Sequence, residues 1–473
     1  MSPALRHGVL LFLVLLAGGA LRLVDLAVRP MHADEANQAV KVGRMLDGES
    51  YRFDPADHHG PTLYYFGFAA AKLRGEHRLA ELSETTLRLV PAFFGTLSIA
   101  LLWRLVAPLG LRAAGWAALF LALSPPATYY SRYFVQETLL VAFTLAALVC
   151  GQRWWSRGGL GWAAAMGACG GLMQATKASA LLFAATALLA LAVFGRARLK
   201  ELGPKPWLVA LAAAALTAGL FYASFGAHPA GWRDALGTLG PMLGKAAGGT
   251  TGHEKPWWYY AGLFLPRSTG GYLWDQTWFF VLAALGGVLA FRGPARLPRF
   301  LALSTAAAFA VLSVTPYKTP WVVVNLVPGL CALAGYLLSR VRPLPAVALG
   351  LAGVLMLGWQ TWLAALHRPA DRRNPYAYVH SSPDVRKFAA LAASAPTGPV
   401  KVISPEYWPL PWYLRDRAEV GYWTTPPADC DGALVIVAAE LAEDVQARLR
   451  GRYQTSFLGL RPGYVLVIFT PEP

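Results

Sequence analysis

Long apolar segments separated by short polar ones fill the first 366 positions of the chain. Most of these segments have roughly 17–25 residues, the length that an α-helix needs to cross a bilayer. The pattern predicts about eleven membrane-spanning helices. The predicted spans are 8–27, 86–106, 113–130, 135–153, 160–176, 178–194, 207–225, 276–291, 300–316, 321–339 and 345–366. The first segment lacks an A-x-A cleavage pattern, so we expect a retained helix and not a signal peptide.

Basic residues gather in every second short loop. The loops at 104–112, 153–158, 195–206, 292–299 and 340–344 each carry at least two Arg or Lys side chains. Loops with such an excess stay in the cytoplasm. We therefore expect a multi-pass protein of the cell (inner) membrane, with a cytoplasmic N-terminus and an extracytoplasmic C-terminal segment.

The C-terminal segment has a different pattern. Between residues 367 and 473, short β-rich runs (400–404, 433–438 and 464–469) alternate with helical stretches (382–395 and 442–453). This alternation predicts a small α/β domain. The expected fold class is a polytopic α-helical membrane protein: a domain of residues 1–366 with long outer loops at 28–85 and 226–275, followed by an extracytoplasmic α/β domain at 367–473.

Composition agrees with a membrane protein. The chain is 56% hydrophobic and 14% charged, whereas a soluble protein has roughly a quarter charged residues. Most of the net charge of +16 lies in the short loops, so we expect a lipid bilayer and no nucleic acid as partner. The four cysteines are scattered, and their spacing implies neither a disulfide framework nor a zinc cluster.

Adjacent carboxylates follow the first predicted span. Asp34 and Glu35 begin the first outer loop, and neighbouring residues on a helix point about 100° apart, so the two acids are not expected to share one task. One could accept a proton while the other orients it or contacts a substrate. Alternatively, both could be solvated acids at a helix N-terminus, where the dipole favours negative charge.

Further charged residues lie at predicted outer ends of spans. Arg132 and Glu137 occur where one span ends and the next begins, and ionisable groups at such depth are often functional, although the two could simply pair. Lys177 and Lys318 occupy short outer turns, where positive charge is disfavoured. Together with Arg132 they suggest an anionic ligand such as a lipid phosphate. The alternative is that their side chains snorkel from helix ends.

Histidines provide the remaining candidates. His32, His58 and His59 suggest a divalent cation near Asp34, but the spacing matches no known ligand motif. His253 and Lys255 precede four aromatic residues, and either substrate contact or membrane anchoring fits them.

Several of these motifs resemble those of known enzymes. The acidic pair after the first span, the Arg132–Glu137 motif and PYKTPW (316–321) resemble the GT-C glycosyltransferases, in particular the protein O-mannosyltransferases and the lipid A aminoarabinose transferases. RPMHADEANQAVK, DHHGPTLYYF, GHEKPWWYY, NPYAYVHSSPDV and SPEYWPLPWYLRD are similar to a bacterial and archaeal group labelled flippase-activity-associated proteins.

The resemblance implies a function. A sugar would pass from a polyprenyl-phosphate carrier to a glycan, lipid or protein acceptor on the outer face, by a single inverting displacement. Asp34 would be the base that activates the acceptor, and Glu35 a secondary group. Arg132, Lys177 and Lys318 would hold the carrier phosphate, and Glu137 would line the acceptor or sugar pocket. His59, His253 and Lys255 are further candidates for substrate binding. The alternative is a flippase for lipid-linked sugars, or an accessory protein of one.

Overall fold

The computed structural model describes residues 2–55, 59–238, 240, 244 and 252–472. These residues form two compact units. Unit 1 comprises residues 1–24, 50–66 and 88–368, and unit 2 comprises residues 25–49, 67–87 and 369–473. Helices α3 (Thr62–Leu73) and α4 (Glu84–Val106) each supply residues to both units.

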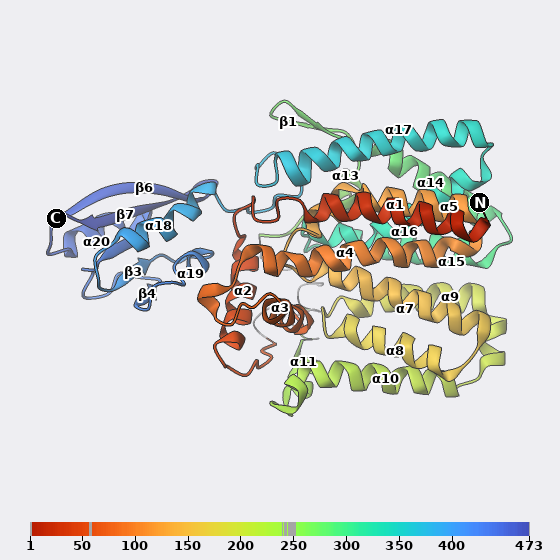
Figure 1. The fold of residues 1–473 in the computed structure, drawn as a ribbon, viewed down its shortest axis with the longest axis horizontal. Helices are drawn as coiled ribbons and strands as arrows, with labels where there is room; N and C mark the ends of the chain where they lie inside the picture. The colour runs from red at the N-terminus through yellow and green to blue at the C-terminus, as the bar shows by residue number, and fades with distance from the viewer. Residues whose placement is uncertain (1, 56–58, 239, 241–243, 245–251, 473) are drawn as a thin grey trace. The chain divides into compact units, whose positions relative to one another are not determined.

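Unit 1 is helical (Figure 1). Its longer helices are α1 (Pro3–Leu23), α5 (Leu111–Ala122), α7 (Glu137–Arg157), α8 (Leu160–Gln174), α9 (Ala180–Leu202), α10 (Lys205–Tyr222), α14 (Thr277–Arg292), α15 (Arg296–Val314), α16 (Val327–Arg340) and α17 (Pro343–Thr361). Shorter elements are α6 (Pro125–Tyr130), α11 (Gly231–Gly237), α13 (Tyr259–Gly262), the β1–β2 hairpin (Arg267–Thr269 and Tyr272–Trp274) and the 3₁₀ helix η4 (Pro320–Asn325).

The prediction of a polytopic helical membrane protein is confirmed. Among the described residues, eight helices are long and apolar enough to cross a membrane, and each overlaps a predicted span. The predicted spans 113–130, 160–176 and 276–291 correspond to shorter helices, α5 with α6, α8 and α14. The count of eleven therefore stays a prediction.

Close helix packing holds unit 1 together. Helix α8 packs against α7 and α10, α16 packs against α5 and α14, and α15 packs against α9. Gly167 explains the tight α8–α10 contact, since a Cβ atom at this position would lie 2.0 Å from the Ala210 carbonyl oxygen. Small residues allow such approaches between membrane helices.

Unit 2 contains the α/β part of the chain. Its strands β3 (Val400–Ile403), β4 (Val420–Trp423), β5 (Leu434–Ala438), β6 (Tyr453–Arg461) and β7 (Tyr464–Pro471) form a mixed sheet of order β4-β3-β5-β7-β6. Strand β3 is parallel to β4 and β5, while β7 is antiparallel to β5 and β6. Helices α2 (Ala33–Leu46), α18 (Lys387–Ser394), α19 (Leu410–Tyr413) and α20 (Ala442–Arg448) complete the unit.

The small C-terminal α/β fold is likewise confirmed. The predicted β-rich runs become β3, β5 and β7, whose central residues are buried as their continuous apolar pattern indicates. The helical stretch predicted at 442–453 ends earlier, because α20 stops at Arg448 and β6 begins at Tyr453. The sequence also left β4 and β6 unassigned.

Candidate functional site

The acidic pair lies in the first turn of α2, where a capping box fixes the backbone. His32 is the N-cap residue, and its Nδ1 accepts the backbone N–H of Asp34 at 3.0 Å. In return, the carboxylate of Glu35 accepts the backbone N–H of His32 at 3.2 Å. Both hydrogen bonds satisfy donors that a helix start would otherwise leave unpaired.

The two carboxylates have different surroundings. Glu35 is fully buried and forms an ion pair with the buried Arg29 at 3.0 Å. The Asp34 side chain is 41% exposed, and its carboxylate lies 4.0 Å from His32 Nδ1. Glu35 is thus engaged in holding the loop, whereas the carboxylate of Asp34 is accessible to a reactant. The two acids thus differ in exposure and in partners, and their separate tasks in a reaction stay a prediction.

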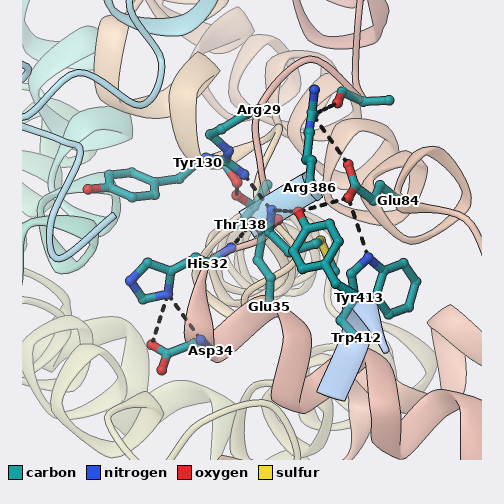
Figure 2. A network of polar contacts seen from close by, with 12 residues as sticks. Arg29, His32, Asp34, Glu35, Glu84, Tyr130, Thr138, Arg386, Trp412 and Tyr413 are labelled. Atoms are coloured by element: carbon teal, nitrogen blue, oxygen red, sulfur yellow. Dashed lines mark hydrogen bonds and ion pairs between the residues drawn. The ribbon is translucent and has the colours of Figure 1, made fainter. Parts of the chain in front are cut away.

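Tyr413 of α19 anchors the same loop (Figure 2). Its phenol oxygen accepts the backbone N–H of Met31 at 2.9 Å and donates to the Glu84 carboxylate at 3.3 Å. The indole N–H of Trp412 also donates to the Glu84 carboxylate, at 3.4 Å. The Arg386 guanidinium lies 3.7 Å from the same carboxylate. The C-terminal segment of unit 2 therefore helps to position the backbone that carries Asp34.

His32 is a neutral structural residue in this arrangement. Because Nδ1 accepts a hydrogen bond, the proton lies on Nε2, which donates to the Tyr378 carbonyl oxygen at 3.1 Å. Burial lowers the pKa of His32, and this effect exceeds the opposing effect of the nearby carboxylates of Asp34 and Glu35. Both ring nitrogens are engaged by the protein itself, an arrangement that does not fit a metal ligand.

The divalent cation predicted from the histidines stays a prediction. His58 lies outside the described residues. Within the described ranges, no group of three or more His, Cys, Asp or Glu side chains is placed to hold a metal ion.

In unit 1, Glu137 and Lys177 form a buried ion pair. Glu137 is the first residue of α7, and Lys177 lies in the turn between α8 and α9. The segment that follows His59 contacts the same turn: Gly60 N–H donates to the Thr176 carbonyl oxygen at 3.1 Å, and Thr62 N–H donates to that of Ala175 at 3.1 Å. Three predicted site residues, Glu137, Lys177 and the half-buried His59, thus lie on segments joined at this turn.

Arg132 holds the end of the first helix. Its guanidinium donates to the carbonyl oxygens of Leu21, at 3.1 Å, and Val24, both in the last turn of α1 or just beyond it. A cation is favourable at this end of a helix because the carbonyl groups there carry partial negative charge. This contact gives Arg132 a structural role whether or not it also binds a ligand.

Lys318 lies where backbone hydrogen bonds join two segments, GHEKP (252–256) and PYKTP (316–320). Lys318 N–H donates to the His253 carbonyl oxygen at 3.0 Å, and Lys255 N–H donates to that of Pro316 at 3.1 Å. The Lys318 ammonium group is buried and donates to the backbone carbonyl oxygens of Lys255, at 3.2 Å, and Thr315. In the described part of the chain it forms no ion pair, and burial lowers the pKa of its side chain. A ligand with negative charge would supply the missing counter-charge.

Tyr260 was not found by sequence reasoning. Its phenol donates to the Thr319 carbonyl oxygen at 3.3 Å, next to Lys318. Burial raises the pKa of Tyr260, and the negative charge of Glu137 contributes in the same direction. Tyr260 therefore lies within electrostatic reach of Glu137. The aromatic run of residues 257–260 gave a signal, but it also fitted membrane anchoring.

Comparison with known proteins places this geometry in context. Residues 59–222 match the family model described as dolichyl-phosphate-mannose-protein mannosyltransferase. None of the curated proteins matches the chain.

Solved structures match over nearly the whole chain. ArnT from Cupriavidus metallidurans, bound to undecaprenyl phosphate, is 16% identical with a TM-score of 0.70, and the match covers 97% of each chain. The oligosaccharyltransferase AglB from Archaeoglobus fulgidus, in complex with an inhibitory peptide and a dolichol-phosphate, is 14% identical with a TM-score of 0.59. That match covers 95% of this chain and 72% of AglB. The chain has the GT-C glycosyltransferase fold.

Proposed function

We propose that the chain transfers a sugar from a polyprenyl-phosphate carrier to a glycan, lipid or protein acceptor on the outer face of the cell membrane, with Asp34 as the general base. The observation that carries the proposal is the contrast between the accessible Asp34 and the buried, ion-paired Glu35. A base must reach the acceptor, so only the exposed acid of the pair suits this role.

The reaction is a single displacement at the anomeric carbon. A hydroxyl or amine of the acceptor attacks this carbon while its proton passes to the Asp34 carboxylate. The bond from the anomeric carbon to the phosphate oxygen breaks, and the electron pair leaves with the polyprenyl phosphate. The configuration at the anomeric carbon is inverted, because the nucleophile attacks from the side opposite to the leaving phosphate.

Cations of unit 1 stabilise the leaving phosphate. Lys318 is the strongest candidate, because it is buried and its described partners are neutral carbonyl oxygens. Lys177 is available after the phosphate displaces Glu137 from their ion pair. Arg132 adds positive charge near the end of α1. Preorganised cations at a developing negative charge are a major source of rate enhancement.

A transfer assay tests the proposal. The purified protein in liposomes is supplied with a panel of radiolabelled polyprenyl-phosphate sugars and with candidate acceptors. We expect label to move from at least one carrier to an acceptor. Label that crosses the bilayer while remaining on the carrier would instead identify a flippase for lipid-linked sugars or its accessory protein, and would contradict the proposal.

A further inference from the structure

Unit 1 contains a large apolar cavity whose lining includes none of the site residues proposed above. Its volume is about 340 Å³, and helices α7, α8, α9 and α15 supply most of its lining. The lining is almost entirely hydrophobic and includes Leu148, Met166, Phe183, Leu191 and Phe194. These helices lie side by side in Figure 1. Such a cavity is suited to a hydrocarbon chain.

A smaller cavity of about 80 Å³ adjoins the large one, and the two together form an elongated apolar path. The two cavities share Leu105, Thr144, Leu148, Phe183 and Ala187 in their walls. Along α7, the combined lining runs from Val141 to Trp155, which corresponds to roughly 20 Å at the rise of an α-helix. The path therefore has a length suited to a lipid chain.

One end of the large cavity is basic. Arg296, the first residue of α15, belongs to the lining together with Trp155 and Trp207. Arg299, less than one turn further along α15, lies over the ring of Phe194, 6.0 Å from its centroid. In the described part of the chain, neither Arg296 nor Arg299 forms an ion pair, and Nε of Arg299 is buried without a hydrogen-bond partner.

We infer that this cavity binds an anionic glycerophospholipid, with one acyl chain along α7 and the headgroup phosphate against Arg296 and Arg299. Basic pockets between membrane helices recognise anionic headgroups in this way. Trp155 and Trp207 suit the boundary between chain and headgroup, because indole rings favour the membrane interface. The headgroup end is distinct from the proposed phosphate site, since Trp155 lies near the last residue of α7, whereas Glu137, the ion-pair partner of Lys177, is its first residue.

Native mass spectrometry of the purified full-length protein tests the inference. The protein is loaded with equimolar phosphatidylglycerol and phosphatidylcholine, and the retained lipid is counted. Wild type is expected to retain phosphatidylglycerol preferentially. The double variant Arg296→Gln/Arg299→Gln should lose roughly tenfold or more of that preference, because each arginine near a phosphate contributes to the attraction. Arg292→Gln is the matched control, since Arg292, the last residue of α14, is exposed four positions before Arg296 and does not line the cavity.

A second variant tests binding of the acyl chain separately from binding of the headgroup. Leu148→Trp adds bulk where the two cavities meet and should lower retention of both phospholipids at an unchanged melting temperature. Equal retention of the two phospholipids by wild type would overturn the inference. Displacement of phosphatidylglycerol by equimolar polyprenyl phosphate would also overturn it, because the cavity would then belong to the carrier.

Discussion

The phenol oxygen of Tyr413 accepts the backbone N–H of Met31 at 2.9 Å, so a residue 382 positions later in the chain fixes the loop that carries Asp34. Glu84 accepts the hydrogen bond that the same phenol donates. We therefore propose that Tyr413 is a positioning residue for transfer, which acts through the backbone of Met31.

Replacing Tyr413 by Phe keeps the ring and removes both hydrogen bonds. We expect kcat for sugar transfer to fall by ~5-fold with little change in KM, because, of these two, only the hydrogen bond from Met31 holds the loop that carries Asp34, and its loss costs about 1 kcal/mol. Tyr464→Phe is the control, since that phenol contacts Ser404 and not the loop. A shift in KM alone would contradict the positioning role.

The two acids of α2 should respond differently to loss of charge. Asp34→Asn should lower kcat on the order of 100-fold or more while the melting temperature is kept, because Asp34 is the proposed base and its side chain is accessible. Glu35→Gln should affect transfer less, but should destabilise the fold by about 3 kcal/mol, because it removes a buried ion-pair partner of Arg29. Near-normal transfer by the purified Asp34→Asn variant would exclude Asp34 as the base.

Acid should loosen the start of α2. Burial lowers the pKa of His32 in the folded protein, so the unfolded chain binds its proton at a higher pH, and stability falls as the pH drops below about 6.5. The protection factors of the amides of residues 31–37, which take out the pH dependence of intrinsic exchange, should fall as the pH is lowered from 7.5 to 5. His32→Asn keeps a side-chain oxygen for the N-cap and does not titrate, so this pH dependence should disappear in the variant.

The ion pair of Glu137 and Lys177 predicts opposite effects on carrier binding. Lys177→Ala should weaken binding of undecaprenyl phosphate, whereas Glu137→Gln should tighten it several-fold, because the phosphate no longer competes with a carboxylate. Isothermal titration in detergent measures both affinities. Weaker binding in both variants would show that the pair only holds the turn together.

The other two cations of the proposed phosphate site can be tested in the same titration. Arg132→Ala and Lys318→Ala should each weaken binding of undecaprenyl phosphate. Unchanged affinity in these two variants and in Lys177→Ala would exclude a phosphate site here.

The proposed topology can be tested separately. A periplasm-specific reporter fused at residue 370 should be active, because the positions of the basic short loops predict that the C-terminal segment lies outside the cytoplasm. Activity of a cytoplasmic reporter alone would reverse the orientation and remove the basis for an outer-face reaction.

Hydropathy predicted the long helices well, since a span needs only sufficient apolar length. It did not reveal helix breaks inside an apolar run: the segment predicted at 113–130 forms two helices, because Ser124 is the N-cap residue of a new helix α6 that begins with Pro125 and Pro126. Strand β6 was missed because Gln454, Thr455 and Ser456 are three consecutive exposed polar residues, which interrupt any apolar alternation.

Positive charge in short outer turns marked Lys177 and Lys318 as candidate site residues, but it could not reveal their partners in the fold. The contact of Lys318 with the segment around His253 joins residues that are more than 60 positions apart. The division of labour between Asp34 and Glu35 likewise depends on Arg29 and the cap at His32, and these contacts become visible only in the folded loop. Tyr413 and Glu84 gave no clear signal for the same reason.

The capping box also bears on related chains. Glu35 holds the backbone and Asp34 is accessible, so exchanging the order of the two acids would not be a conservative change. A homologous chain that keeps His32 and Glu35 but carries a neutral residue at position 34 should fold normally and still bind its lipid. We expect such a chain to be a pseudoenzyme, and its occurrence beside an intact copy in one genome would point to a regulatory or scaffolding duty.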